Sequence, residues 1–172
     1  MRENSQIADV SSGGDTLLLR IKILACVLAF SAAQLAAAKD LALVSNKGND
    51  TAGISLQDLV KACKGQTSRW PDGKPLTVVI LDPDSAEMKL VLQKIYESSA
   101  EQVKTLISTA NHGRANHPAI IVVGSDEALV QKVEALPGAI GLVDVYSITG
   151  RVAVVRVAGK LPLEPGYALH GN

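Results

Sequence analysis

Short apolar runs, each followed by a segment with helical periodicity, are the feature that most constrains how this chain folds. Two of these runs, Thr77–Leu81 and Ala119–Val123, are apolar almost throughout and rich in β-branched residues. Strands that are apolar on both faces are typical of sheets covered by helices on each side. The alternation therefore predicts an α/β domain, in which a layered, mixed sheet is flanked by helices.

Further strands are predicted near the two ends of this domain. Leu41–Ser45 is a short apolar run that leads into a polar loop, and Ala139–Val145 follows a Pro-Gly pair. A last strand is predicted over Val152–Ala158, where Arg156 is expected to face outward. We expect the first and last of these strands to pair as a small antiparallel element. The Pro- and Gly-rich segment 161–172 is expected to be a loosely held tail.

The predicted helices share a recognisable start. Each is preceded by a serine: Ser55, Ser85, Ser99 or Ser125. A serine at this position can accept a hydrogen bond from a free amide of the first helical turn. After Ser55, Asp58 completes a pattern like that of a capping box, and Gly65 ends the helix. Apolar residues then recur at three- and four-residue steps, which is typical of amphipathic helices.

The first 38 residues have the order of a secretory signal peptide. A polar leader precedes Arg20 and Lys22, an apolar run covers residues 23–33, and three alanines stand at 36–38. This apolar run is short for a bilayer span of ~20 residues, so cleavage is favoured over an uncleaved anchor. The sequence therefore predicts a periplasmic protein with no stable membrane span after cleavage, in which residues 39–160 form the folded domain.

Charge and cysteine content narrow the possible partners. The chain has 17 basic and 17 acidic side chains, a balance that does not favour nucleic acid as a partner. Cys63 is the only cysteine after the predicted leader, so no disulfide within the mature chain is expected. Its place on a helix indicates a buried apolar thiol. Lipidation of Cys26 is the less favoured alternative, because most of the apolar run follows it.

The chain has no motif typical of catalysis. It contains no nucleophile elbow, no Gly-rich phosphate loop and no His-Glu-x-x-His sequence. Asp82, Asp84 and Glu87 offer oxygen ligands, but the segment has no glycine turn of the kind a calcium loop needs. His112 and His117 are five residues apart, which is not the spacing of a helical zinc pair. The sequence predicts a protein that is not an enzyme and uses neither metal nor cofactor.

Two segments resemble the substrate-binding components of phosphate-type ABC transporters. Residues 54–76 read ISLQDLVKACKGQTSRWPDGKPL, and residues 135–143 read ALPGAIGLV. The resemblance covers roughly Leu41–Val145 and implies a type 2 periplasmic binding-protein fold. Full-length members of that family have two lobes that close on a ligand. Because this chain is much shorter, the resemblance implies a single layered α/β lobe of the periplasmic binding-protein type.

The anion-binding element of the family is altered in this chain. In family members, the strand after the tryptophan ends in an arginine, and Ser-Gly-Thr then begins a helix whose amides hold the anion. Here residues 81–87 read LDPDSAE, so Ser85 is kept while Ala86 and Glu87 replace the glycine and the threonine. Acid or proline stands where the arginine is expected. Carboxylates around such a site repel phosphate, which predicts weak or lost anion binding.

Three residues are the candidate ligand contacts: Asn46, Ser85 and Arg114. Asn46 belongs to a VSNKGN segment that resembles a strand-to-loop segment of the family. Ser85 could receive an anion together with helix amides, although a role as N-cap alone explains it. Arg114 lies in a polar loop where family members often carry a basic Gly-Arg pair. Trp70 is interpreted as a core residue, not as a platform for a ligand.

Together these features predict an exported, non-catalytic solute-binding domain, similar to phosphate-transporter binding proteins, with weak or lost anion binding. Its candidate partners are a small anion or a periplasmic or membrane protein. The alternative is a ligand-free periplasmic structural or protein-interaction module with the same fold. The single-lobe length and the altered anion element favour this alternative.

Overall fold

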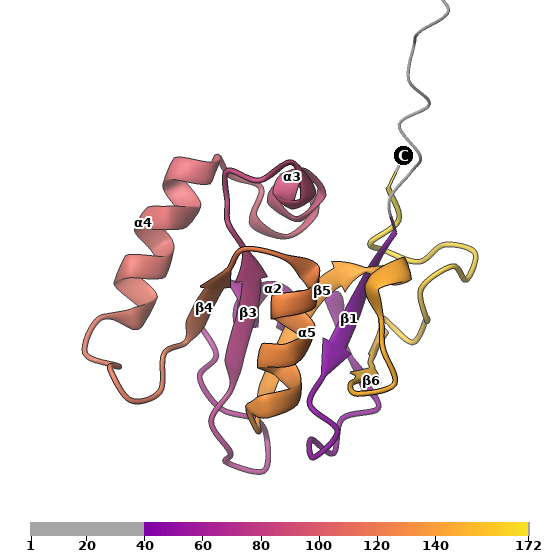
Figure 1. Ribbon diagram of the computed structural model, residues 1–172, viewed down its shortest axis with the longest axis horizontal. Coiled ribbons are helices and arrows are strands. Elements are labelled where there is room, and N and C mark those ends of the chain that lie inside the picture. The colour runs from indigo at the N-terminus through magenta and orange to yellow at the C-terminus, as the bar shows by residue number, and fades with distance from the viewer. Residues whose placement is uncertain (1–39, 172) are drawn as a thin grey trace, which may run out of the picture. The chain divides into compact units, whose positions relative to one another are not determined.

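The structure is a computed structural model that describes residues 40–171. The predicted polar leader and signal peptide, residues 1–38, lie outside the described residues. Within the described part, five strands form one sheet in the order β4-β3-β5-β1-β6 (Figure 1). Their bounds are β1 Leu41–Ser45, β3 Thr77–Leu81, β4 Ile120–Val123, β5 Ala139–Asp144 and β6 Ala153–Val154.

The sheet is mixed. β3 is parallel to β4 and to β5, whereas β1 is antiparallel to β5 and to β6. The predicted antiparallel pairing of the first and last strands is confirmed, because Val44 pairs with Val154 and Ser45 with Ala153. The pairing is part of the main sheet and not a separate element, since every residue of β1 also pairs with a residue of β5. The predicted α/β class with a mixed sheet is confirmed.

Helices cover both faces of this sheet. α5 packs across β5, β3 and β1 on the face toward the viewer in Figure 1, and α2 lies behind the sheet in that view. All residues of β1 and β3 are buried as a result. β4 is an edge strand, which leaves Val122 exposed. The helical segments are α2 Leu56–Cys63, η1 Ala86–Met88, α3 Lys89–Val91, η2 Leu92–Tyr96, α4 Ala100–Asn111, α5 Asp126–Ala135 and η3 Val145–Ser147.

Three of the four predicted serine caps are confirmed. Ser55 accepts the backbone N–H of Asp58 at 3.1 Å, and Ser125 caps α5 in the same way. Ser99 forms a complete capping box with Gln102, whose side-chain oxygen accepts the Ser99 N–H at 3.0 Å. These bonds satisfy amides that a helix start otherwise leaves free, which explains why the sequence pattern located the helices correctly.

The segment after Ser85 differs from the prediction. The Ser85 side chain makes no capping hydrogen bond, and the chain winds first as a 3-10 turn, then as one α-helical turn and last as a π-helical turn. It ends at Glu97, whose φ is +50°. The Tyr96 hydroxyl donates to the Cys63 carbonyl at 3.1 Å, so the irregular end is attached to α2. Burial raises the pKa of Tyr96, which keeps its hydroxyl protonated as a donor.

The prediction of one continuous strand over Val152–Ala158 is wrong. The Val155 N–H donates to the carbonyl of Leu43 in β1, but the next residue, Arg156, donates to Ala52. The chain thus leaves the main sheet after β6 and forms β7, Arg156–Val157, which pairs in parallel with β2, Gly53–Ile54. Two short strands in two sheets replace the single predicted strand.

The C-terminal segment also differs from the loose attachment expected of it. Tyr167 and Leu169 are buried. The Leu169 carbonyl accepts the N–H of Leu41 at 3.2 Å, and His170 is paired with the buried Asp40. The Pro- and Gly-rich composition predicts little ordering, but burial of Tyr167 and Leu169 together with these contacts fixes the segment beside the start of β1.

The two ends of the sheet differ in what they present. We call the end where β3, β4 and β5 finish the carboxyl end, and the end where they begin the amino end. Because β1 is antiparallel to β5, the loop after β1 also lies at the amino end. Between residues 40 and 171, no helix has the length and apolar character needed to cross a membrane.

Candidate functional site

The loop after β3 lies at the carboxyl end of the sheet, where the resemblance places an anion element. Its polar groups bond mainly to one another. Asp82 accepts the backbone N–H of Asp84 on its carboxylate at 3.0 Å, and its carbonyl accepts the N–H of Ser85 at 2.9 Å. Ser85 in turn accepts the N–H of Met88 on its carbonyl at 3.2 Å. The amides of Asp84, Ser85 and Met88 are therefore occupied inside the loop.

Ser85 itself is half-buried, and its hydroxyl oxygen is buried without a hydrogen-bond partner. The helical turn that follows, η1, has only three residues. It continues directly into α3 and η2, so the helical segment changes its winding twice instead of starting as a regular α-helix. The retained serine thus stands before an irregular, uncapped helix start and not before the regular one that the resemblance implies.

Charge at this loop is unfavourable for an anion. Asp82, Asp84 and Glu87 are all exposed and acidic. The nearby cation, Lys104 of α4, contacts Asp84 at 2.6 Å and Glu101 at 3.0 Å. The hydrogen bonds to these carboxylates raise the pKa of Lys104. Its positive charge therefore offsets acidic side chains and is not left available for a ligand.

Asn46 lies at the amino end of the sheet, directly after β1, and is buried. Its side-chain amide donates to the carbonyls of Val133 at 3.0 Å and Glu134 at 2.7 Å, near the end of α5. Its side-chain oxygen accepts the N–H of Gly48 at 2.8 Å. These bonds satisfy carbonyls that a helix end otherwise leaves free. Both donors of the amide are thus used within the fold.

Arg114 lines a shallow pocket of about 550 Å³ between the ends of α2 and α4. Lys64 and His112 line it as well, and no acidic side chain does. The hydroxyls of Thr105 and Thr109 in the same pocket donate to carbonyls of their own helix. Because two helix C-termini meet here, basic side chains already complement the partial negative charge of the helix ends.

The structure does not bring the three predicted contact residues together. Ser85 follows the carboxyl end of β3, whereas Asn46 and Arg114 lie at the amino end. These last two are also apart from each other. Asn46 bonds to Ala139 at the start of β5, and Arg114 lies in the loop before the edge strand β4. No single site formed by all three residues exists in the described part of the chain.

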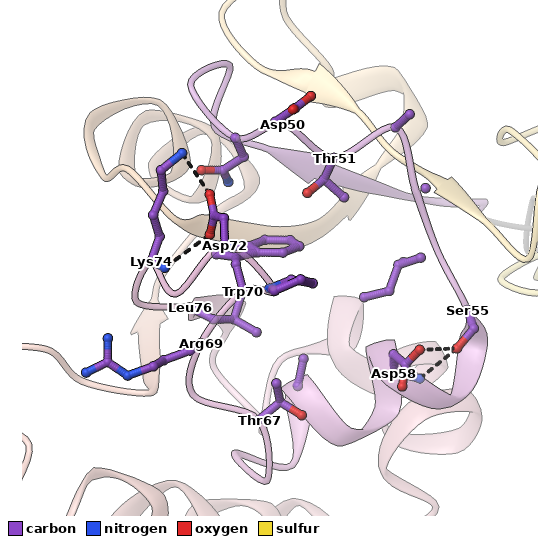
Figure 2. A pocket seen from close by; sticks show the side chains of 16 residues that line it. Asp50, Thr51, Ser55, Asp58, Thr67, Arg69, Trp70, Asp72, Lys74 and Leu76 are labelled. Atoms are coloured by element: carbon purple, nitrogen blue, oxygen red, sulfur yellow. Dashed lines mark hydrogen bonds and ion pairs between the residues drawn. The ribbon is translucent and has the colours of Figure 1, made fainter.

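A larger pocket, of about 810 Å³, lies at the amino end and was not predicted from the sequence. It is bounded by the loop and strand of residues 49–55, by α2 and by the hairpin of residues 67–76 (Figure 2). We call it the Trp70 pocket. The sequence signal that could have located it is the Trp-Pro-Asp-Gly turn, which places a large aromatic side chain on a tight, exposed hairpin.

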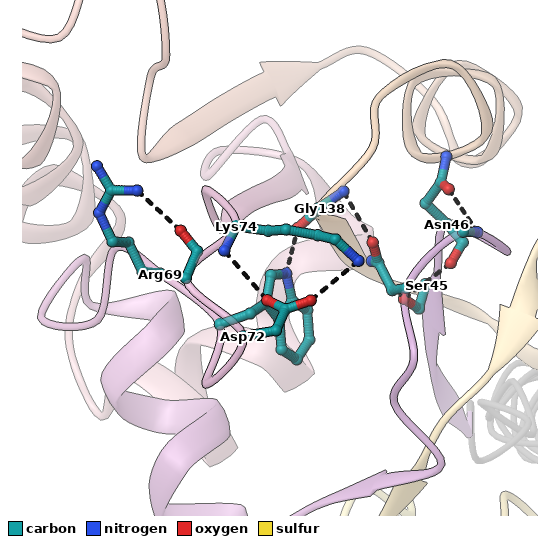
Figure 3. Close-up of polar contacts among 10 residues, drawn as sticks. Ser45, Asn46, Arg69, Asp72, Lys74 and Gly138 are labelled. Atoms are coloured by element: carbon teal, nitrogen blue, oxygen red, sulfur yellow. Dashed lines mark hydrogen bonds and ion pairs between the residues drawn. The ribbon is translucent and has the colours of Figure 1, made fainter.

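Trp70 is half-buried, packs against the core and lines this pocket. Its indole N–H donates to the carbonyl of Gly138 at 2.9 Å (Figure 3). Its backbone N–H donates to the carbonyl of Lys74 at 2.9 Å. The interpretation of Trp70 as a core residue is therefore incomplete. One part of the ring packs on the protein, and the remainder is accessible from the pocket.

The hairpin that carries Trp70 is closed by charged side chains. Lys74 contacts the Asp72 carboxylate at 2.9 Å, and its backbone N–H donates to the same carboxylate at 3.1 Å. These hydrogen bonds lower the pKa of Asp72. Arg69 donates to the Gly73 carbonyl at 2.8 Å, and its side chain points away from the pocket in Figure 2. The turn is thus held in one conformation, and so is the tryptophan next to it.

A second network joins this hairpin to the loop after β1. The Asn49 side-chain oxygen accepts the N–H of Gly138 at 2.8 Å, and its amide donates to Ser45 at 2.8 Å and Ala139 at 3.1 Å. Gly138 therefore bonds to Asn49 through its N–H and to Trp70 through its carbonyl. Two walls of the Trp70 pocket share this one glycine as their anchor.

No protein-family model and no curated protein sequence matches this chain. Solved structures do. An ABC-type phosphate transport receptor from Vibrio cholerae is 18% identical with a TM-score of 0.62, and the match covers 82% of this chain and 59% of the receptor. PstS from Borrelia burgdorferi is 15% identical with a TM-score of 0.60, covering 78% and 55%. A phosphate binding protein from Stenotrophomonas maltophilia is 17% identical with a TM-score of 0.54, covering 73% and 40%.

These likenesses establish the fold. This chain has the α/β fold of phosphate-transport substrate-binding proteins, and the resemblance stated from the sequence is confirmed at that level. The chain spans about half the length of these solved structures, between 40% and 59% of each. The neighbours are a transport receptor and binding proteins, not enzymes. Within residues 40–171, no cluster of three or more His, Cys, Asp or Glu side chains is arranged to hold a metal ion.

Proposed function

We propose that this chain is an exported, non-catalytic domain of the solute-binding type, in which anion binding at the carboxyl end of the sheet is weak or lost. The fold supports the solute-binding type, because the matched structures are a phosphate transport receptor and phosphate-binding proteins. The signal-peptide order of residues 20–38 supports export. The working partners of such a domain are a small solute or another exported or membrane protein.

The observation that carries this proposal is the self-contained acidic loop after β3. Backbone amides of Asp84 and Ser85 already bond to Asp82, and the helical segment that follows begins as an uncapped 3-10 turn. A phosphate placed there meets the exposed carboxylates of Asp82 and Glu87, whereas that of Asp84 is paired with Lys104. Unpaired like charges a few ångströms apart cost on the order of 1 kcal/mol each in a solvated site. That cost is as large as the ~0.3–1 kcal/mol a helix terminus contributes.

Calorimetry with inorganic phosphate at low ionic strength tests this directly. We expect no binding tighter than about millimolar for the purified protein, and no change in the Ser85→Ala variant. Micromolar phosphate binding that disappears in Ser85→Ala would refute the proposal. Such a result would mean that the amides and hydroxyl at this loop overcome the surrounding carboxylates.

A charge variant tests the physical cause. Asp82→Asn combined with Glu87→Gln removes two carboxylates from the loop and is expected to strengthen phosphate binding by about 10- to 30-fold at low ionic strength. The matched control, Asp50→Asn combined with Glu134→Gln, removes the same charge at the amino end and should leave phosphate affinity unchanged. Equal effects of the two double variants would show that overall charge, not this loop, determines the affinity.

A further inference from the structure

We infer that the Trp70 pocket is a binding site for a neutral carbohydrate. This inference stands apart from the proposed function, because the pocket lies at the amino end of the sheet and the acidic loop at the carboxyl end. A pyranose ring has an apolar C–H face and a rim of hydroxyls. It needs a flat apolar surface with non-ionic hydrogen-bonding groups beside it, and those are the two kinds of group that the pocket combines.

The flat surface is the indole of Trp70. Its N–H is already bonded to Gly138 at 2.9 Å, so a ligand meets the ring itself and not its polar atom. Bonds from Trp70 to Lys74 and from Arg69 to Gly73 fix the hairpin. An aromatic ring held in this way loses little conformational freedom when a ligand stacks on it, which favours binding.

The rim supplies unused hydrogen-bonding groups. Thr51 and Thr67 both line the pocket and are half-buried, and their hydroxyls bond to no other residue among the described ones. In the view of Figure 2 the Trp70 ring lies between these two threonines. A hydroxyl can donate and accept, as a sugar hydroxyl can, so the two sides match in either direction.

The edge of β2 adds backbone groups. The carbonyls of Ala52 and Ile54 accept N–H groups from the β7 segment at 3.2 and 2.9 Å. Because successive carbonyls of a strand point in opposite directions, the carbonyl of Gly53 faces away from β7. Gly53 also lines the Trp70 pocket. Its peptide group is therefore a further polar contact for a ligand on that side.

The charges of the pocket favour a neutral ligand. Asp72 is paired with Lys74. The Asp58 carboxylate accepts the Ser55 hydroxyl at 2.7 Å and contacts Lys61 at 3.5 Å. The remaining acid, Asp50, is exposed, so it offers a cation only a weak, solvent-screened contact. The cations that line the pocket, Arg69 and Lys74, are likewise engaged, since Arg69 donates to the Gly73 carbonyl and Lys74 contacts Asp72.

Trp70 makes the test simple, because it is the only tryptophan in the chain. Its fluorescence is followed while the purified protein is titrated with methyl glucoside, methyl galactoside, N-acetylglucosamine, maltose and cellobiose. Choline and inorganic phosphate serve as cationic and anionic comparisons. We expect a saturable change in emission with at least one sugar and none with choline or phosphate. Calorimetry with the same sugars detects binding that leaves the emission unchanged.

Paired variants assign the binding to this pocket. Thr51→Val and Thr67→Val keep the side-chain shape but remove the hydroxyl, and each should weaken sugar binding by about 3- to 10-fold. Thr51→Ser keeps the hydroxyl and should retain the affinity, which separates a lost contact from a disturbed fold. Thr105→Val, at an exposed position of α4, is the matched control and should have no effect.

The inference is overturned if no sugar of the panel produces fluorescence change or heat, or if choline alone binds. It is equally overturned if a sugar binds but the Thr51→Val/Thr67→Val double variant has unchanged affinity. None of these results bears on phosphate binding at the acidic loop, so failure here is distinguishable from failure of the proposed function.

Discussion

Gly138 is the position where one added methyl group should do most damage. The residue has a φ of +85°, and a Cβ added to it would lie 2.0 Å from the carbonyl oxygen of Pro75. It also makes three hydrogen bonds. Its N–H donates to Asn49 at 2.8 Å, and its carbonyl accepts the Trp70 indole N–H at 2.9 Å and the backbone N–H of Thr77 at 3.3 Å.

The expected cost of Gly138→Ala follows from these contacts. A positive φ costs an alanine about 1–2 kcal/mol. The Pro75 carbonyl belongs to the backbone and cannot rotate away. Real Cβ atoms essentially never come within 3.0 Å of such an atom, so the segments that carry Gly138 and Pro75 must separate by about 1 Å to relieve the clash. Separation on that scale weakens all three bonds, at about 0.5–1.5 kcal/mol each. We expect a loss of about 3–6 kcal/mol in the free energy of unfolding.

Urea unfolding followed by circular dichroism measures this loss, with Trp70 fluorescence as a second probe. Gly73→Ala is the matched control, because Gly73 has the same φ of +85° but no atom within 4 Å of the position that a Cβ would take. It isolates the backbone strain and should cost only about 1–2 kcal/mol. If Gly138→Ala loses no more stability than Gly73→Ala, the close approach to Pro75 does not hold the hairpin and the reasoning is refuted.

Two further predictions concern Cys63 and Asn111. Burial raises the pKa of the Cys63 thiol to about 12. In a Cys26→Ser background, the native protein should therefore not react with a thiol reagent at pH 8 but should react once it is unfolded in urea. Labelling of the native protein as fast as the unfolded protein would contradict this burial. The Asn111 side chain bonds to both the N–H and the carbonyl of Ile120, at 3.0 and 2.8 Å, so Asn111→Ala should cost about 1–3 kcal/mol and speed hydrogen exchange of the Ile120 amide. Unchanged protection of that amide would count against this role for Asn111.

Local sequence signals predict much of this fold. The runs at Leu41–Ser45 and Thr77–Leu81 are buried strands because branched apolar side chains fit a sheet covered on both faces. Ser55, Ser99 and Ser125 begin helices because their hydroxyls satisfy free amides within three residues. Both kinds of signal act over a few residues, so they can be interpreted without knowledge of the tertiary structure.

Features that depend on distant contacts are not predictable in the same way. Val152–Ala158 has the alternation of one strand, yet its two halves pair with different strands, β1 and β2, and only the tertiary fold decides that. The buried Tyr167 and Leu169 depend on space beside β1, which composition does not reveal. For the same reason the sequence suggests Asn46 as a ligand contact, although its amide bonds to carbonyls 87 and 88 residues away.

The candidate site shows the same limit. The motif that contains Ser85 lies in the loop after β3, but its sequence does not reveal the hydrogen bonds within that loop. The sequence favours a core position for Trp70 because a lone tryptophan is most often buried. Its place at the mouth of a pocket depends on the hairpin of residues 67–76, on Gly138 and on the loop and strand of residues 49–55. No spacing within the sequence brings those three elements together.

The acidic loop and the Trp70 pocket lie at opposite ends of the sheet, so their electrostatic surroundings differ. β3 has five residues and connects the Trp70 hairpin to the acidic loop, a length of roughly 16 Å at about 3.3 Å per residue. Exposed charges are screened over about 8 Å at physiological ionic strength. The carboxylates of the acidic loop therefore disfavour phosphate at the carboxyl end without repelling a ligand beside Trp70. Weak or lost anion binding at one end of the sheet, as proposed, is therefore compatible with a binding pocket at the other end.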